Sequence, residues 1–278
     1  MKIVTLDFEC FAHDWLVVIK DHKTKTYTKI WNDNDAFKAC LDDDIIFVGF
    51  NIKHYDQFLM KAVCADFSPE EVKKVNDYII LGHNEGWTYE PLRDYRFYAN
   101  IVDVMDDMQV GQSLKSIEGH LFMNIEETNV DFNISRALTA EEKELTEKYC
   151  TADVDATEKI FDLRKDYFTN KIKIGRLAGL DEVKAMGMTN AKLTAAMLKA
   201  KAKPHDDERQ YMYRDNLLKE YIPQEVFNFF NRMYDSSLSD DEVFKGDKLK
   251  LNIGDCAVVM GYGGIHGAIP NLIWHEGG

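Results

Sequence analysis

The sequence lacks the features of a membrane-spanning or exported protein. None of its 278 residues belongs to an apolar run close to the roughly 18 residues that a membrane-spanning helix needs. The opening residues, Met1 to Ile3, lead directly into an expected strand and show no signal peptide. We therefore expect a cytoplasmic protein that does not contact a membrane.

Cysteine is scarce as well. The five cysteines are scattered and form no Cys-x-x-Cys pair: Cys10, Cys40, Cys64, Cys150 and Cys256. An odd and dispersed set argues against a disulfide framework and against a structural zinc site. These cysteines are consistent with a reducing compartment.

Positive charge is also in short supply. The chain has 34 Lys and Arg residues against 48 Asp and Glu residues, a formal net charge of −14. Net negative charge argues against binding of nucleic acid by charge alone. However, residues 170–203 hold eight Lys and Arg residues against two acids. We expect this segment to form a basic part of an otherwise acidic surface.

The order of the apolar segments predicts an α/β fold. Residues 1–9 form a strand, and residues 45–50 are a dense apolar run typical of a strand buried on both faces. Capping patterns at Ser68 and Thr139 predict two helices. Further strands are expected at residues 15–19, 25–31 and 99–105, and further helices at residues 35–41, 55–65, 113–118 and 189–201. An antiparallel meander followed by alternating helices and strands indicates a mixed sheet flanked by helices.

The opening strand ends in two carboxylates. Side chains two residues apart point the same way in a strand, so Asp7 and Glu9 share one face while Leu6 and Phe8 share the other. Buried carboxylates without a partner cost several kcal/mol or take up protons. A divalent cation is one such partner, and a strand end facing solvent is the alternative.

Two further acidic motifs follow in the chain. Asp56 comes just after the apolar run 45–50, in the pattern Asn51-x-x-x-Tyr55-Asp56. Tyr149 and Asp153 are four residues apart in an expected helix and therefore share a face. Each motif alone also fits an ordinary role, such as a first-turn acid, a packing residue or a surface charge. Their joint occurrence, in this order, favours a common site.

These three motifs resemble those of the DEDD exonuclease superfamily, in the branch that carries a tyrosine and includes the proofreading domains of DNA polymerases. The resemblance covers about residues 1–168 and implies an RNase H-like fold. Segments 101–105, 113–115, 126–132 and 149–157 are similar to the exonuclease region of phage replicative DNA polymerases. Residues 263–268 look like the segment that joins the exonuclease and polymerase domains of those enzymes.

The resemblance implies hydrolysis of phosphodiesters with two metal ions. Two Mg²⁺ or Mn²⁺ ions prefer oxygen ligands and stabilise the attacking and leaving oxygens. By resemblance, Asp7 would bridge both ions, and Glu9 and Asp153 would complete the site that activates water. Asp56 would hold the second ion, and Tyr149 would position the attacking water.

The implied substrate is the 3′ end of single-stranded or frayed DNA. A cleft for one strand binds it through phosphate contacts and base stacking. Asn51 is expected to contact the substrate or to orient the site, and Lys115 to meet a phosphate. Phe11 and Tyr55 are candidates for stacking. Phe8 is another, with a place in the core as the alternative.

Three further residues have competing interpretations. Asp155 lies two residues beyond Asp153, so on a helix it points elsewhere and is left out of the site. Asp103 lies on an expected strand, where it could line the cleft; a role in structure or in supporting the site is favoured over that alternative. His266 lies in the Gly-rich stretch 261–267, for which a plain turn is favoured over a loop that cradles a phosphate.

The resemblance divides the chain into an exonuclease domain, residues 1–168, and a mostly helical, partly basic extension, residues 169–278. The extension would connect to a polymerase domain or subunit, so this chain alone is not expected to synthesise DNA. Two other functions stay open from the sequence. One is a stand-alone RNA exonuclease, and the other is a catalytically silent module that binds nucleic acid.

Overall fold

The computed structural model describes residues 2–108, 111–201, 223–235, 237–239, 242–243, 248–253, 256–261 and 264–268. The chain divides into two compact units, residues 1–201 and residues 202–278. We describe each unit by itself.

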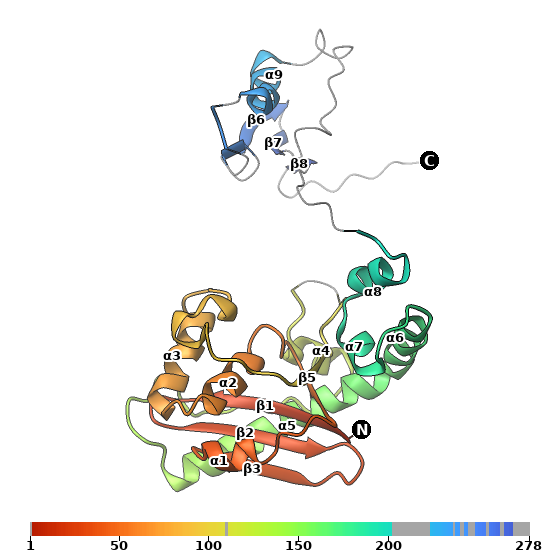
Figure 1. Cartoon of the computed structure of the whole chain (residues 1–278). Coiled ribbons are helices and arrows are strands. Elements are labelled where there is room, and N and C mark those ends of the chain that lie inside the picture. The colour runs from red at the N-terminus through yellow and green to blue at the C-terminus, as the bar shows by residue number, and fades with distance from the viewer. Residues whose placement is uncertain are drawn as a thin grey trace. The chain divides into compact units, whose positions relative to one another are not determined.

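The first unit is built on a five-stranded mixed sheet with the strand order β3-β2-β1-β4-β5 (Figure 1). Strands β1, β2 and β3 form an antiparallel meander, and β4 and β5 are parallel to β1. The bounds are β1 Lys2–Cys10, β2 Trp15–Asp21, β3 Tyr27–Trp31, β4 Ile45–Gly49 and β5 Asn100–Asp103. The predicted mixed α/β sheet is therefore confirmed.

Helices cover both faces of this sheet. On one face, Leu6 and Phe8 pack into a core with side chains from α1, Asn34–Lys38, α2, Asp56–Cys64, and α3, Pro69–Ile80. On the other face, α5, Ala140–Leu163, runs across the sheet (Figure 1). Its Cys150 and Val154 pack on β2, and its Ile160 and Phe161 pack on β4 and β5. Strand β4 contributes side chains to both cores, as its continuous apolar run predicts.

The two strongest predicted helix starts are observed. At the start of α3, the Ser68 side chain accepts a hydrogen bond from the N–H of Glu71, and the Glu71 carboxylate accepts one from the N–H of Ser68. Thr139 and Glu142 make the same reciprocal pair at the start of α5. Each pair satisfies two amide groups that a helix end leaves without partners.

The remaining helices of the first unit follow the sheet in the chain. Their bounds are η1 Gly86–Thr88, η2 Glu90–Leu92, α4 Leu114–His120, α6 Lys165–Leu177, α7 Glu182–Gly187 and α8 Asn190–Met197. The domain boundary expected at residues 168 and 169 falls within α6. There Phe168 is buried against Phe161 of α5, with ring centroids 5.0 Å apart. Residues 165–201 therefore pack with the sheet.

The second unit contains a three-stranded antiparallel sheet with the order β6-β7-β8. Its elements are α9 Gln224–Asn231, η4 Arg232–Tyr234, β6 Leu249–Ile253, β7 Cys256–Gly261 and β8 Gly264–Ala268. The described residues of the expected extension, 169–278, include most of α6 and helices α7, α8 and α9, but they also include this three-stranded sheet, which the expectation did not contain. Residues 264–268, expected in a Gly-rich loop, form strand β8, and His266 pairs with Val259. Backbone pairing with the apolar strand β7 outweighs the low strand propensity of glycine.

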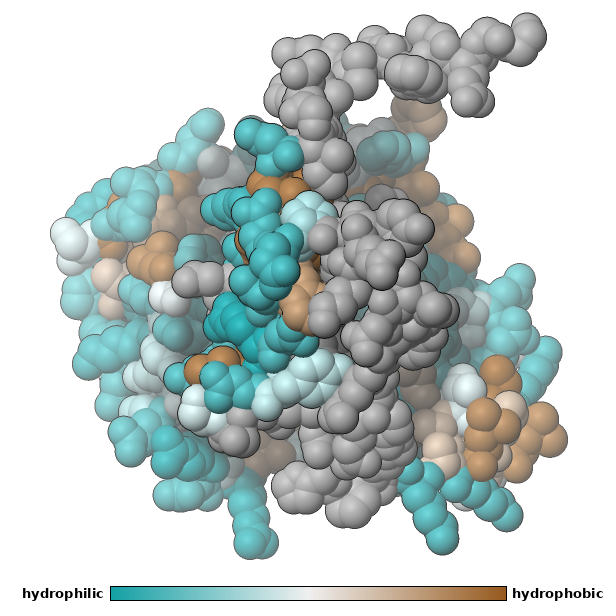
Figure 2. All heavy atoms as spheres, turned by 90° about the horizontal axis from the view of Figure 1, so that it is seen from above, coloured by the Kyte–Doolittle hydropathy of each residue, from teal (hydrophilic) through white to brown (hydrophobic). Residues whose placement is uncertain are grey.

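The described surface is largely hydrophilic, and hydrophobic side chains lie in separate groups on the face shown in Figure 2. The most exposed large hydrophobic residues of the first unit come from different segments: Leu81, Trp87, Tyr98, Phe122, Leu177 and Leu198. Among the described helices, none combines the length and the hydropathy that a membrane crossing requires. Cys10, Cys40, Cys64 and Cys150 are free thiols.

Candidate functional site

The site lies where β1 extends beyond its parallel neighbour. Pairing between β1 and β4 runs from Lys2 to Thr5 and ends at the pair Thr5 and Val48. Strand β1 continues to Cys10 against β2, so Asp7 and Glu9 lie past the end of β4. Both carboxylates leave the sheet on the face that α5 covers. The carboxyl edge of parallel strands is the usual position of sites in α/β sheets.

The turn after β4 is fixed by sterics and by one buried acid. Gly49 has no room for a side chain, because a Cβ atom there would lie 2.7 Å from the Cβ of Ile52. Asn51 takes a positive φ of 60°. The Asp103 carboxylate accepts hydrogen bonds from the N–H groups of Asn51 at 2.9 Å, Lys53 at 3.1 Å and Met105 at 2.9 Å. Asp103 therefore has the structural role given as one of its two interpretations.

This turn places Asp56 beside the acid pair, Asp7 and Glu9. Asp56 is the first residue of α2, where a negative charge is favoured by the helix dipole. Its carboxylate lies beside β1, because the N–H of Phe8 interacts with it. The side chain is 1 % exposed, and its Oδ1 atom has no hydrogen-bond partner. A buried carboxylate oxygen without a partner is costly unless it takes up a proton or binds a cation.

Helix α5, which packs on the sheet beside β1, supplies the fourth acid, Asp153. Tyr149 and Asp153 lie one helical turn apart, and the Tyr149 hydroxyl is close enough to the Asp153 carboxylate to act on its pKa. Cys150 points toward β1. Its Sγ lies 3.5 Å from the Asp7 carbonyl oxygen and 3.6 Å from the Asp7 Oδ2. The donor atoms of Asp7, Glu9 and Cys150 all lie within 4.8 Å of one another.

Electrostatics shows that the four acids are neighbours. Burial raises the pKa of Asp7 well above its ordinary value, and the charges of Asp56, Glu9 and Asp153 raise it further. Burial, then Asp153 and Asp56, raise the pKa of Glu9 in the same way. Burial is also the main cause that raises the pKa of Asp56 to about 7. Carboxylates from three elements, β1, α2 and α5, thus disfavour one another's ionisation.

Lys115 is a cation within this group. Its ammonium donates a hydrogen bond to Asp153 and lies 3.4 Å from the Glu118 Oε2 and 4.8 Å from the centre of the Tyr149 ring. Burial is the largest single influence and disfavours the charged lysine, but the hydrogen bonds and charges of Asp153 and Glu118 together outweigh burial and raise the lysine pKa. Lys115 was expected to meet a substrate phosphate. The structure adds that it also compensates part of the acid charge.

Solvent reaches the group through Asp7, which is partly exposed while Glu9, Asp56 and Asp153 are buried. Tyr55 adjoins the acids, because Asp56, Glu9 and Asp7 contribute to raising its pKa after burial and Cys10. Its hydroxyl donates a hydrogen bond to Asn76 at 2.6 Å. The position of Tyr55 is compatible with the substrate contact that the sequence predicts.

Two aromatic candidates belong to the core. Phe11 is fully buried beside Val130 and Leu138, and its ring stacks on Phe132 with centroids 5.1 Å apart. The prediction of Phe11 as a substrate residue was therefore wrong, since a stacking platform must be accessible. Phe8 is buried next to other core rings and fits its alternative interpretation.

Asp155 faces away from the site, as its spacing from Asp153 predicts. It accepts hydrogen bonds from the Lys20 ammonium and the Tyr27 hydroxyl, both at 2.6 Å. Sequence reasoning missed Cys150 and Glu118 as members of the site. The sequence does contain an indication for Cys150: it lies three residues before Asp153, and residues three apart share a face of a helix.

The donor set suits small, hard divalent cations. Carboxylate oxygens of Asp7, Glu9, Asp56 and Asp153 are the ligands that Mg²⁺ and Mn²⁺ prefer. The unpaired Oδ1 of buried Asp56 and the mutual repulsion of the acids both call for added positive charge. The residues therefore fit the ions that the motifs imply.

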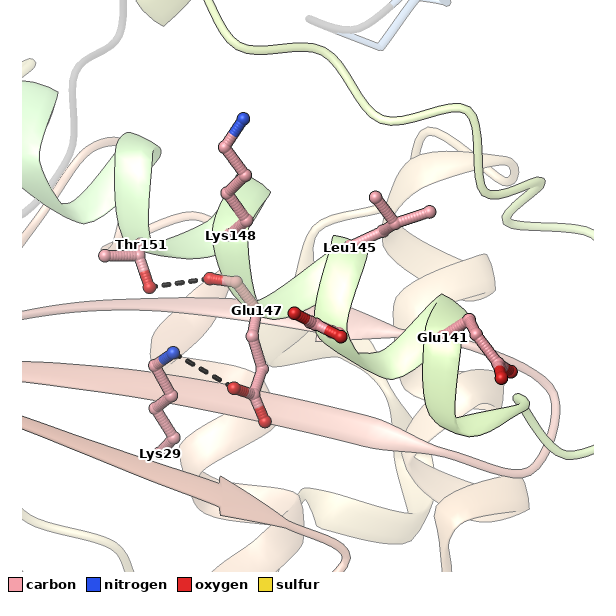
Figure 3. Close-up of a pocket in the computed structure, with 7 residues that line it drawn as sticks. Lys29, Glu141, Leu145, Glu147, Lys148 and Thr151 are labelled. Atoms are coloured by element: carbon pink, nitrogen blue, oxygen red, sulfur yellow. Dashed lines mark hydrogen bonds and ion pairs between the residues drawn. The ribbon is translucent and has the colours of Figure 1, made fainter.

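A surface pocket of about 730 Å³ lies elsewhere on α5, toward β3 (Figure 3). Lys29 reaches across it to the Glu147 Oε2 at 3.0 Å, and the Thr151 hydroxyl donates to the backbone carbonyl of Glu147 at 2.6 Å. The Trp31 indole also donates to Glu147, at 2.9 Å. Both lysines of this pocket are paired, Lys29 with Glu147 and Lys148 with Glu126, whereas the acid group holds a buried oxygen without a partner.

Comparison with protein-family models gives no match to this chain, and comparison with curated proteins gives none either. Any assignment of function therefore depends on the geometry of these residues and on the order of the motifs.

Proposed function

We propose that the protein is a 3′→5′ exonuclease that hydrolyses single-stranded or frayed DNA 3′ ends, on an RNase H-like fold. The observation that carries this proposal is the convergence of four carboxylates from β1, α2 and α5. Asp56 and Asp153 raise the pKa values of Asp7 and Glu9, and Asp56 itself is buried with a carboxylate oxygen that has no hydrogen-bond partner. The antiparallel meander followed by parallel strands supports the fold assignment.

The proposed roles follow from position. Asp7 is partly exposed and adjoins all three other acids, which suits a ligand shared between two Mg²⁺ or Mn²⁺ ions. Glu9 comes from the same strand, Asp153 from α5, and Asp56 from the start of α2. When bound, two such ions stabilise charge on the attacking and leaving oxygens. The Tyr149 hydroxyl, close to Asp153, orients the water that attacks the phosphorus.

The proposed substrate contacts surround this group. Lys115 is placed to exchange its bond to Asp153 for a bond to a substrate phosphate once cations neutralise the acid. Tyr55 adjoins the acids, and Asn51 lies in the turn that leads to Asp56. Proofreading for a polymerase domain or subunit is the proposed setting, because the motif order resembles that of phage replicative polymerases.

The experiment is incubation of a 3′-labelled DNA single strand with the full chain, with Mg²⁺ or with EDTA. A matched RNA strand and a recessed primer with all four nucleotides run in parallel. We expect stepwise shortening of DNA in the presence of Mg²⁺, slower shortening of RNA, and no primer extension. Asp7→Ala is the control for a contaminating nuclease.

Each other outcome identifies an alternative. Faster degradation of RNA than of DNA would establish the RNA exonuclease instead. Binding of the DNA strand without cleavage, together with no Mg²⁺ or Mn²⁺ binding by calorimetry, would establish the silent binding module. Lengthening of the primer would contradict the expectation that synthesis resides elsewhere.

A further inference from the structure

Cys150 introduces a sulfur atom into a site otherwise built from oxygen ligands. Its thiol is buried between α5 and β2, and its Sγ lies 3.6 Å from the Asp7 Oδ2. The Sγ, a carboxylate oxygen of Asp7 and one of Glu9 are mutually within 4.8 Å. These three donors are close enough together to form a candidate site for one cation.

The separation of sulfur and oxygen matches a particular coordination. Zinc binds sulfur at about 2.3 Å and carboxylate oxygen at about 2.1 Å, and a tetrahedral angle between them separates the two atoms by about 3.6 Å. Asp7 and Cys150 are therefore already placed as neighbouring ligands of such an ion. A second, independent feature points to a cation. The Oδ1 of Asp56, beside the same residues, is buried and unpaired.

We propose that Asp7, Glu9 and Cys150 form a binding site for a thiophilic divalent cation, Zn²⁺ or Cd²⁺, whose occupation blocks the magnesium-dependent reaction. Binding breaks the S–H bond of Cys150, forms a sulfur–metal bond and releases one proton to solvent, with no change of oxidation state. Thiolate ligands select soft cations, whereas Mg²⁺ requires oxygen ligands. The thiol thus adds affinity for the inhibiting ion without adding affinity for the activating one.

This inference rests on the proposed function only in treating the acids as ligands of an activating metal. Because Asp7 belongs to both sets, the two kinds of ion exclude each other. The alternative is that the Cys150 thiol only fills the core and donates a hydrogen bond to Asp7. That role predicts no sulfur–metal bond, so spectroscopy separates the two.

The test is titration of the metal-free full chain with cadmium chloride, followed by the ultraviolet charge-transfer absorption of a thiolate–cadmium bond. We expect one band that saturates near one equivalent in the parent and in Cys40→Ser, a control thiol on the far side of the sheet. The band should vanish in Cys150→Ser. Its apparent affinity should fall by at least about tenfold in Asp7→Asn, which keeps the thiol.

A band that persists in Cys150→Ser, or no band in the parent, would overturn the proposal. Should Cys150→Ser fail to fold, Asp7→Asn decides, since an unchanged cadmium affinity in that variant excludes shared coordination. The readout needs no turnover. A band with no nuclease activity therefore refutes the proposed function alone, and nuclease activity with no band refutes this inference alone.

Discussion

Helix α5 carries acidic residues on two sides, and the two sides differ in how many cationic side chains contact those acids. On one side, Glu158 receives Lys20 at 2.7 Å, Lys25 at 3.0 Å and His22 at 3.1 Å, and Asp155 shares Lys20. On the other side, Asp153 faces three further carboxylates and a single described lysine, Lys115. The acids of the first side are paired with lysine and histidine side chains, whereas Lys115 compensates only part of the negative charge on the second side.

The two sides also shift the pKa values of their carboxyl groups in opposite directions. Burial disfavours the charged form of Glu158, but hydrogen bonds to Lys20 and Lys25 outweigh burial and lower its pKa. Burial raises the pKa of Asp153, and Lys115 and Tyr149 offset this only in part. Paired charges secure the helix to the sheet. Unpaired charges that cost stability are typical of functional sites.

Removal of one acid from each side gives the largest expected contrast. Asp7→Ala should reduce magnesium-dependent cleavage of single-stranded DNA by several orders of magnitude, because it removes the shared ligand. Asp155→Ala should cleave near the parent rate, because its bonds go to Lys20 and Tyr27. Initial rates on a 3′-labelled strand measure both. Near-parent cleavage by Asp7→Ala would refute the site.

Within the acid side, a positioning group should matter less than a ligand. Tyr149→Phe removes one hydroxyl and should slow cleavage by about 10- to 1000-fold, the range of single positioned groups. Asp153→Ala should cost far more. Single-turnover rates at saturating Mg²⁺ compare them, and equal losses in the two variants would show that the assigned roles are wrong.

The lysines of the two sides should differ in how they affect stability. Lys20→Met leaves Glu158 with fewer partners and should cost about 1–3 kcal/mol of unfolding free energy, whether or not Mg²⁺ is present. Lys115→Met should also destabilise the metal-free protein, but Mg²⁺ should restore it by replacing the lost charge. Urea unfolding with EDTA and with Mg²⁺ measures both. If Mg²⁺ also restored the unfolding free energy of Lys20→Met, the proposed difference between the two sides of α5 would be wrong.

The smallest expected effect is in the pH dependence of metal-free stability. Burial and repulsion raise the folded-state pKa of Asp7, Glu9 and Asp56, the last from 3.8 to about 7. Between the unfolded-state and the folded-state pKa values of these acids, the folded protein binds more protons than the unfolded protein. Stability is therefore lost as pH rises through this range. Glu158, whose pKa is lowered, acts in the opposite sense at acid pH.

Urea unfolding in EDTA between about pH 5 and pH 7 isolates the acid side, because Glu158 stays ionised there. Asp7→Asn should flatten the loss of stability over this range, since one repelling carboxylate is gone. The same substitution at Asp155 serves as control and should leave the slope unchanged. A parent protein that gains stability as pH rises would contradict the assignment of raised pKa values.

Local patterns in the sequence predicted much of the sheet unit. Alternation placed Asp7 and Glu9 on one face and Leu6 and Phe8 on the other, and capping motifs predicted the starts of α3 and α5. These features depend on neighbours within a few residues. The meander and the parallel strand β4 followed from the order and texture of apolar runs.

Features that depend on distant residues were not predicted. Phe11 is buried by Val130, Leu138 and Phe132, more than a hundred residues later in the chain. The bond between Lys115 and Asp153 joins α4 to α5 through side-chain geometry that spacing does not reveal. Strand β8 forms because β7 offers a partner, which outweighs its glycines.

The carboxylate of Asp103 has a consequence for motion. It holds the amides of Asn51, Lys53 and Met105, so the turn before α2 and the end of β5 cannot open separately. Amide hydrogen exchange should therefore detect these three groups as one cooperative unit with a common opening free energy. Each such opening would release the start of α2 and with it Asp56. The exchange rate of three backbone amides would then report how often the site comes apart.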